Sequence, residues 1–339
     1  MNRIIKLAFV IAVVFGALTA CAAEPEVNAI EDLKVMFVNS KDPASVVTAT
    51  EPLKQLLIDS LATKGYEVAN VTIEVTGTYE AAGEALSSGT AQLAFIPGAT
   101  YVLYHEDGAE LLLVSTRDGL NKDSETAKDW NDGQATLPVE EQVSFYRSLI
   151  LAGPTETGKA LAAKVNAGEA LTWADVDGAN WCFSNSVSSS AGYLFPTVWL
   201  MDNFDGKKLT DLSSATTGGY ADILAGLAAG TCDVGVGYAD IRRDYEAKWT
   251  TDFARSESIW AEVEVIGVTA KIFNDTISYS ANNEDMTPEF VKALQEAFVE
   301  IAATEAGAAA IAIYSHKGYQ VGTDSDYDVQ RAAIEATKE

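Results

Sequence analysis

Apolar and polar residues alternate between two spacings along most of the chain, which predicts strands and helices in turn. Short apolar runs predict strands at residues 33–38, 68–75, 91–96, 110–116, 143–151, 181–183, 232–238, 263–268 and 272–279. Helical apolar spacing predicts helices at residues 47–64, 79–87, 197–204, 221–229, 288–304, 305–314 and 324–339, and one that begins within 153–160. This alternation predicts an α/β fold with mostly parallel, doubly wound sheets.

The order of these elements also predicts two lobes. A polar segment from Asp118 to Glu141 has no clear period, and we expect it to be an exposed excursion. The apolar pattern resumes after this segment and returns near Trp260. We expect a discontinuous first lobe, 33–152 plus 266–339, and a second lobe, 153–265, with a hinge where the chain crosses near 146–152 and 265–278.

The first 20 residues have the pattern of a secretory signal peptide. Arg3 and Lys6 precede the apolar run Leu7 to Leu18, which is short for a transmembrane helix. The following Leu-Thr-Ala-Cys resembles the bacterial lipobox, whose cysteine, here Cys21, is lipidated and becomes the first mature residue. Residues 21–32 are then a lipid anchor and linker that tether the protein outside the cytoplasmic membrane. The alternative is ordinary secretion with a free cysteine.

The net charge limits the classes of molecule that the protein can bind, and the cysteine content suggests a disulfide. Without residues 1–20 the chain keeps 21 basic and 49 acidic residues, a net charge of −28, which disfavours nucleic acid and anionic membranes as partners. A small anion is still allowed, because local donors outweigh a distant, screened charge. Cys182 and Cys232 remain as an even pair in an oxidising compartment, so we expect a disulfide, with two buried thiols as the alternative.

The stretch from Ser184 to Pro196, SNSVSSSAGYLFP, is the strongest candidate site. It places hydroxyls and a glycine where a strand is followed by a helix. Free backbone N–H groups and the positive end of the helix dipole gather at such a junction, so the serines would add donors to an anion. The alternative is an ordinary helix cap and turn.

Catalytic chemistry has little support in the sequence. Gly153 to Lys159 spells GxxxxGK, but the next residue is Ala160 instead of the hydroxyl residue that a nucleotide site uses for magnesium. The chain has two histidines, His105 and His316, which we expect at a surface or interface, so neither a histidine metal site nor a catalytic triad is readily assembled. The serines lack the GxSxG motif of the α/β-hydrolases.

Several stretches, in this order, resemble the PhnD-like phosphonate-binding proteins of ABC importers, which have the type II periplasmic binding-protein fold. The resemblance covers most of residues 34–330. Its segments are TYEAAGEALSSGTAQLAFIPGATYV (78–102), LTWADVDGANWCFS (171–184), SSSAGYLFP (188–196), GGYADILAGLAAGTCDVG (218–235), FND (273–275) and DSDYDV (324–329).

The resemblance implies a set of ligand-binding residues. The family's Ser-Thr-Ser-Gly-Tyr motif falls on Ser189, Ser190, Ala191, Gly192 and Tyr193, so the third hydroxyl is absent and Ser188 is a substitute donor. Tyr220 occupies a position where the family usually has histidine, and it is a neutral donor. The remaining implied positions are the aromatic residues Tyr79 and Tyr101 and the acids Asp240 and Asp275.

The resemblance implies a binding lipoprotein without enzymatic activity, cofactor or metal, which closes two lobes on a phosphonate, phosphite or related oxyanion and delivers it to ABC permease subunits. Asp240 and Asp275 suggest a ligand with a cationic end, unless they face solvent or pair with Arg242 or Arg243. The alternatives are a binding protein or sensor for a sulfonate or carboxylate, and an exported serine hydrolase.

Overall fold

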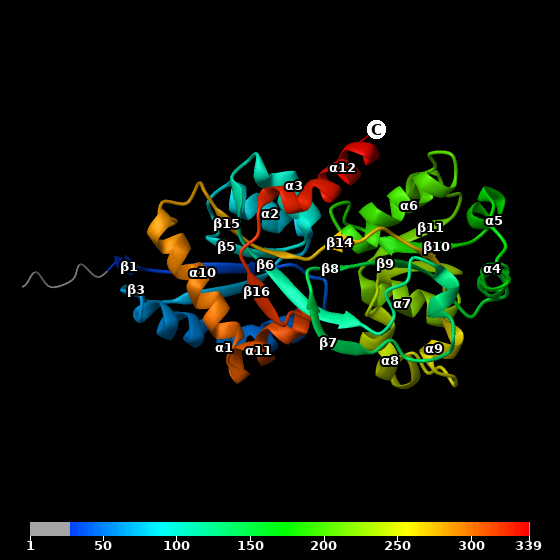
Figure 1. The fold of residues 1–339 in the computed structure, drawn as a ribbon, viewed down its shortest axis with the longest axis horizontal. Coiled ribbons are helices and arrows are strands. Elements are labelled where there is room, and N and C mark those ends of the chain that lie inside the picture. Colours follow the sequence, from blue (N-terminus) through cyan, green and yellow to red (C-terminus); the bar gives the residue numbers. More distant parts are fainter. Residues whose placement is uncertain (1–27, 339) are drawn as a thin grey trace, which may run out of the picture.

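The computed structural model describes residues 28–338 and contains two main β-sheets that lie side by side, each flanked by helices (Figure 1). The predicted signal peptide, Cys21 and the first part of the linker lie outside these residues. The predicted α/β fold is confirmed. The sheets are mixed and not mostly parallel as predicted, because the segments that run between them add antiparallel strands to each parallel set.

The seven-stranded sheet has the order β16-β6-β15-β5-β2-β4, with β7 paired to β6. Its parallel part is formed by β2 with its neighbours β4 and β5, and the other pairs are antiparallel. The strands are β2 (Leu33–Phe37), β4 (Val71–Val75), β5 (Leu93–Ile96), β6 (Ala109–Leu120), β7 (Pro138–Val143), β15 (Thr276–Ser280) and β16 (Gly318–Gln320).

Helices on this side are α1 (Pro43–Ala62), α2 (Tyr79–Ser87), α3 (Gly98–His105), α10 (Pro288–Ala302) and α11 (Glu305–Ile311). Helix α1 begins four residues before the predicted start, because the Asp42 side chain accepts a hydrogen bond from the Ser45 N–H at 2.9 Å. Beside this sheet, β1 (Asn28–Ile30) pairs with β3 (Tyr66–Val68), so the strand predicted at 68–75 is divided between β3 and β4.

The five-stranded sheet has the order β11-β10-β12-β9-β13. Its strands are β9 (Ser148–Ala152), β10 (Trp181–Ser184), β11 (Ala215–Gly218), β12 (Val234–Tyr238) and β13 (Glu264–Val268). Helices on this side are α4 (Glu156–Asn166), α5 (Trp173–Asp177), α6 (Phe195–Asn203), α7 (Tyr220–Ala229), α8 (Ile241–Thr251) and α9 (Ile259–Glu262).

Two short strands and the last helix connect the halves. Strands β8 (Phe145–Tyr146) and β14 (Ile272–Phe273) pair antiparallel between the two sheets (Figure 1). Helix α12 (Asp328–Thr337) packs on α3 of one half and α6 of the other. Strand β9, expected at the end of the first lobe, pairs within the five-stranded sheet.

The segment from Asp118 to Glu141 is mostly exposed, as predicted, but it is not a free excursion from the fold. The segment begins inside β6, ends inside β7, and carries the 3₁₀ helix η1 (Ala127–Trp130) onto β13. Trp130 is 1 % exposed, and Asn131 exchanges two hydrogen bonds with the backbone of Val265, at 2.7 and 2.9 Å. One buried aromatic ring and one side-chain amide therefore anchor a largely polar segment.

All six tryptophans of the chain lie between residues 130 and 260. In the structure they belong to, or pack against, the hydrophobic core around the five-stranded sheet. The two hydrophobic clusters of the seven-stranded sheet contain leucine, isoleucine, phenylalanine and tyrosine but no tryptophan among residues 28–338.

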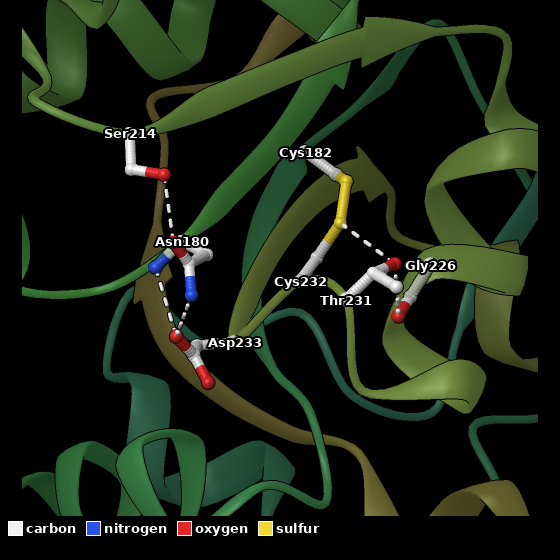
Figure 2. The surroundings of a disulfide bond; sticks show 7 residues. All are labelled: Asn180, Cys182, Ser214, Gly226, Thr231, Cys232 and Asp233. Carbon is white, nitrogen blue, oxygen red and sulfur yellow. Dashed lines mark hydrogen bonds between the residues drawn. A yellow bond between two sulfur atoms is a disulfide. The ribbon is translucent and has the colours of Figure 1, made fainter.

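Cys182 and Cys232 form a disulfide within the five-stranded sheet (Figure 2). It joins Cys182 in β10 to Cys232, which lies two residues before β12 begins. The two Cα atoms are 5.8 Å apart. Gly226 of α7 lies against it, because a Cβ there would be 2.6 Å from the sulfur of Cys232. The loop closed by this bond contains Ser184 to Pro196 and Tyr220.

No single helix within residues 28–338 has both the length and the apolar composition needed to cross a membrane. Helix α10 and the segment Glu305–Tyr314 meet these criteria only as a pair bent by 99°.

Candidate functional site

A cavity of about 50 Å³ lies where the two halves meet, which is room for a few water molecules or one small polyatomic ligand. Its walls come from loops at the carboxyl ends of β2, β5, β10 and β12, the place where α/β sheets commonly bind ligands. The lining residues are Ser40, Lys41, Tyr79, Pro97, Ser115, Arg117, Tyr146, Ser189, Ser190, Ala191, Tyr220, Tyr238, Asn274, Asp275, Tyr314, Ser315 and His316.

The serine-rich stretch forms one wall of this cavity. Ser189 caps a π-helical turn, Ser190–Leu194, that leads directly into α6. Its hydroxyl accepts a hydrogen bond from the Gly192 N–H at 3.3 Å and lies 3.3 Å from the Tyr220 hydroxyl. The buried Ser190 hydroxyl lies near the Tyr146 phenol and makes no hydrogen bond of good geometry among residues 28–338. An unsatisfied buried hydroxyl beside a helix start is suited to an anionic acceptor.

Gly192 acts behind the wall and does not line the cavity. A Cβ at this position would lie 2.6 Å from the Cβ of Ser184 and 2.7 Å from the hydroxyl of Ser189. The absent side chain therefore lets the turn pack against the end of β10 and fixes the position of Ser189.

Five tyrosines surround the cavity: Tyr79, Tyr146, Tyr220, Tyr238 and Tyr314. Burial is the main cause that raises the pKa of each phenol, so all five remain protonated at neutral pH. Two of the hydroxyls already donate within the protein, Tyr238 to Asp244 at 2.8 Å and Tyr314 to the Val38 carbonyl at 2.6 Å. The tyrosines provide a polar surface without charge.

Two cations reach the cavity from the seven-stranded side. The Arg117 guanidinium lies 4.9 Å from the centre of the Tyr146 ring and 3.5 Å from Asp240. Lys41 donates to the Tyr238 hydroxyl at 2.5 Å and to Asp244. Burial lowers the pKa of Lys41 against the opposing effect of Asp244. Each cation therefore has a carboxylate partner from the other half.

Asp275 and His316 lie together in the cavity wall, with 3.9 Å between Oδ2 and Nε2. His316 is 4 % exposed and lies in the wall of the cavity where the two halves meet, so of the two expected positions, a surface or an interface, it occupies the interface. Burial lowers the pKa of His316 against the opposing effect of Asp275, so the ring is neutral at pH 7. Among residues 28–338, the ion-pair partner of Asp275 is thus the neutral ring of His316 and not a lysine or arginine.

The cavity brings together Ser189, Ser190, Tyr220, Tyr79 and Asp275 of the predicted binding residues. The other four, Ser188, Gly192, Tyr101 and Asp240, do not line it.

Tyr101 and Asp240 have partners elsewhere. The Tyr101 hydroxyl donates to Asp324 at 2.9 Å, and its ring packs against Tyr327, so it connects α3 to the C-terminal segment. Asp240 is 3 % exposed and lies 3.1 Å from Arg243 as well as beside Arg117. Pairing with Arg243 was one of the alternatives open for this acid.

The sequence did not identify Lys41, Arg117, Tyr146, Asn274 or His316 as lining residues. Four of them are single polar or aromatic residues in a loop or strand with no neighbouring motif, whereas Asn274 lies in the FND segment of the family resemblance, beside Asp275. The available signal was position, since Lys41 follows the end of β2, and loops at the carboxyl ends of parallel strands form the binding edge. Within residues 28–338, no group of three or more His, Cys, Asp or Glu side chains is arranged to hold a metal ion.

The sequence profile of one family, described as ABC transporter, phosphonate, periplasmic substrate-binding protein, matches residues 35–327. The chain belongs to this family. Members of the family are substrate-binding components of transporters and not enzymes.

Solved structures of this type share the fold. A binding component of an ABC phosphonate transporter from Pseudomonas aeruginosa is 13 % identical, with a TM-score of 0.62 over 90 % of this chain and 86 % of that one. PhnD1 from Prochlorococcus marinus, in complex with methylphosphonate, is 13 % identical, with a TM-score of 0.59 over 90 % and 97 %. The chain therefore has the two-lobed type II periplasmic binding-protein fold. No curated protein matches the chain in sequence.

Proposed function

We propose that this family member binds a small phosphonate-class oxyanion in the cavity between its halves and delivers it to the permease subunits of an ABC importer. The proposal is carried by one observation. Ser189 and Ser190 from the five-stranded side and Arg117 and Lys41 from the seven-stranded side converge on one small cavity. Hydroxyl donors and cations on opposite walls suit the several acceptor oxygens of such an anion.

Binding in this position implies closure by a hinge. Strand pairing favours lobe boundaries between β8 and β9 and between β13 and β14, slightly different from the expected limits at 152 and 265. With these boundaries, β8 and β14 form the hinge, because they are the paired segments between the two sheets. Each of these strands is two residues long.

Asp275 suggests the chemistry of the ligand's other end. A carboxylate in a closed cavity repels an anion, and a cationic group on the ligand removes this conflict. Asp240 does not support a cationic group on the ligand, because Arg117 and Arg243 already pair with this acid. The preferred ligand is therefore an aminoalkyl phosphonate such as 2-aminoethylphosphonate, placed with its amine towards Asp275.

A second candidate ligand class is a singly charged oxyanion such as a sulfonate. It is favoured by the carboxylate partners of both cations, which leave the cavity with less positive charge than two free cations would give. Phosphite and small carboxylates are further alternative ligands that should be compared with sulfonates in the same binding experiment. A sensor that presents the ligand to a membrane receptor would use the same site.

Titration calorimetry tests the proposed function. We expect methylphosphonate to bind and 2-aminoethylphosphonate to bind about tenfold or more tightly. Asp275→Asn should remove this preference, whereas Asp59→Asn, on the exposed face of α1, should leave it unchanged. Tighter binding of alkyl sulfonates or dicarboxylates would contradict the phosphonate assignment, and equal affinity for ethylphosphonate and the amine would contradict the role of Asp275.

We also propose that Cys21 is lipidated and holds the protein at the outer face of the cytoplasmic membrane. The support is the signal-peptide pattern that ends in Leu-Thr-Ala-Cys. A tethered protein stays close to its permease, which raises the effective concentration of loaded protein.

A further inference from the structure

One carboxylate of the seven-stranded half holds the serine loop of the other half. Glu80, the second residue of α2, accepts hydrogen bonds from the hydroxyls of Ser186 at 2.8 Å and Ser188 at 3.0 Å. It also accepts a longer bond from the Ser188 N–H at 3.4 Å. The Thr100 hydroxyl of α3 donates to the Ser188 hydroxyl at 3.1 Å, so two helices of one half hold Ser188.

The hydroxyl groups of this contact are largely removed from solvent, and Glu80 itself is half-buried. Ser186 is 6 % exposed, Ser188 is 1 % and Thr100 is not exposed. Burial raises the pKa of Glu80, but hydrogen bonds from its own backbone N–H, Ser186 and Ser188 outweigh this and lower it overall. The ionised carboxylate therefore accepts charge-assisted bonds, which are stronger than bonds between neutral groups.

The contact lies next to the cavity on both sides. On α2, Tyr79 lines the cavity and the next residue, Glu80, holds the serine loop. On the loop, Ser188 bonds to Glu80 and the next residue, Ser189, lines the cavity. Separation of the halves would break these hydrogen bonds and displace Ser189 from Tyr79 in one movement.

We propose that Glu80, with Ser186 and Ser188 as its donors, is a positioning contact that holds the two halves closed and slows release of the ligand. The ligand-release part rests on the proposed function. The closure part does not, because the Glu80 bonds are made between protein groups alone. Glu80 does not line the cavity, so it acts through Ser189 and not by touching the ligand.

The closure part is tested on ligand-free protein with two spin labels. Cysteines that replace Val47 on α1 and Glu246 on α8, both exposed, place labels on two helices that line a common groove between the halves. We expect Glu80→Ala to shift the inter-label distances to longer values. The double variant with both Ser186→Ala and Ser188→Ala should give the same shift. A triple variant that combines the three substitutions should show little further increase in distance, because the acid and its serine donors form one contact.

Matched controls separate this role from a general loss of stability. Glu84→Ala removes an exposed acid one turn later on α2 and should leave the distances unchanged. Glu80→Gln, which keeps the shape and an acceptor, should give an intermediate shift, and thermal melting by circular dichroism confirms that each variant is folded. Distances in folded Glu80→Ala and in the serine double variant that match wild type would overturn the proposal.

Ligand release is measured separately by stopped-flow dissociation of methylphosphonate. Methylphosphonate should dissociate about tenfold faster from Glu80→Ala than from wild type, with little change in its association rate. A faster association and an unchanged dissociation rate would overturn the release part. If wild type binds no oxyanion, the proposed function fails, while the distances still decide whether Glu80 holds the halves together.

Discussion

Ser189 has three neighbours that fix it as a donor. The Gly192 N–H bonds to its oxygen, the Tyr220 hydroxyl lies 3.3 Å away, and Glu80 holds the preceding residue. A hydroxyl fixed in this way loses little conformational freedom when it binds an anion, so more of its interaction energy appears as affinity.

Ser189→Ala should weaken oxyanion binding about tenfold or more, because a hydrogen bond to a charged group contributes roughly 1.5–3 kcal/mol. Ser190→Ala should act in the same direction, since its buried hydroxyl makes no hydrogen bond of good geometry among residues 28–338. Calorimetry with the preferred ligand measures both, and Ser256→Ala, an exposed serine, is the control. If neither cavity serine changes the affinity, the anion binds elsewhere.

The lining residues that the sequence identified are those with a local signature. Ser189 and Ser190 stand in a run of hydroxyls before a helix, and Tyr79, Tyr220 and Asp275 came from the family resemblance. Arg117 and His316 have no such signature. They line the same cavity because β16, which begins two residues after His316, pairs with the residues of β6 just before Arg117, and the register of two distant strands is not visible in local spacing.

At the scale of elements, η1 shows where hydrophobic patterning fails. Its segment is mostly polar, so periodicity predicts a solvent-exposed loop, but Trp130 is buried in the core of the five-stranded sheet, and Leu120, Ala127 and Ala135 pack partly buried against this core. The Trp130 indole N–H donates to the Ser124 carbonyl at 3.0 Å, and the Trp130 carbonyl accepts from buried Arg242 at 3.3 Å. One large ring with satisfied polar groups anchors a segment that has no apolar stripe.

Trp130→Ala should lower the free energy of unfolding by about 3–5 kcal/mol, the usual effect of truncating a buried tryptophan. Leu137→Ala, in the same segment but with Leu137 52 % exposed, should change it by less than about 0.5 kcal/mol. Urea unfolding followed by circular dichroism measures both. Similar small losses in the two variants would mean that the segment is not anchored through Trp130.

Other elements were missed for a related reason. Strand β11, Ala-Thr-Thr-Gly, is mostly exposed at a sheet edge, and α8 has only a narrow buried face, so neither gives a strong apolar pattern. Strongly patterned elements were found because their buried residues follow a regular local spacing: every third or fourth residue in α10 and consecutive residues in β12.

At the scale of the whole molecule, the two halves are joined by more than a hinge. Strands β8 and β14 cross between the sheets, the β6 to β7 segment reaches β13, and α12 packs on both halves. A movement that opens the cavity must therefore bend the two crossing strands while η1 and α12 keep or adjust their contacts. Local sequence patterns predicted the crossings, but not these two additional links.

The proposed lipidation of Cys21 belongs to this scale, because an anchor would decide where the whole protein works. We expect labelled palmitate to be incorporated into wild type and not into Cys21→Ser, and the variant to leave the membrane fraction. Ala23→Ser, two residues away, should behave as wild type. A wild-type protein without label, recovered in the soluble exported fraction, would contradict the anchor.

The placement of all six tryptophans in the five-stranded half has a spectroscopic consequence. Indole fluorescence reports on that half alone, while the far-ultraviolet signal of helices and strands reports on both. Denaturation curves from the two signals coincide only if the halves unfold together, and they separate if one half unfolds first. The natural sequence thus contains a label for one half of the molecule, which allows the cooperativity between the halves to be measured without any added dye.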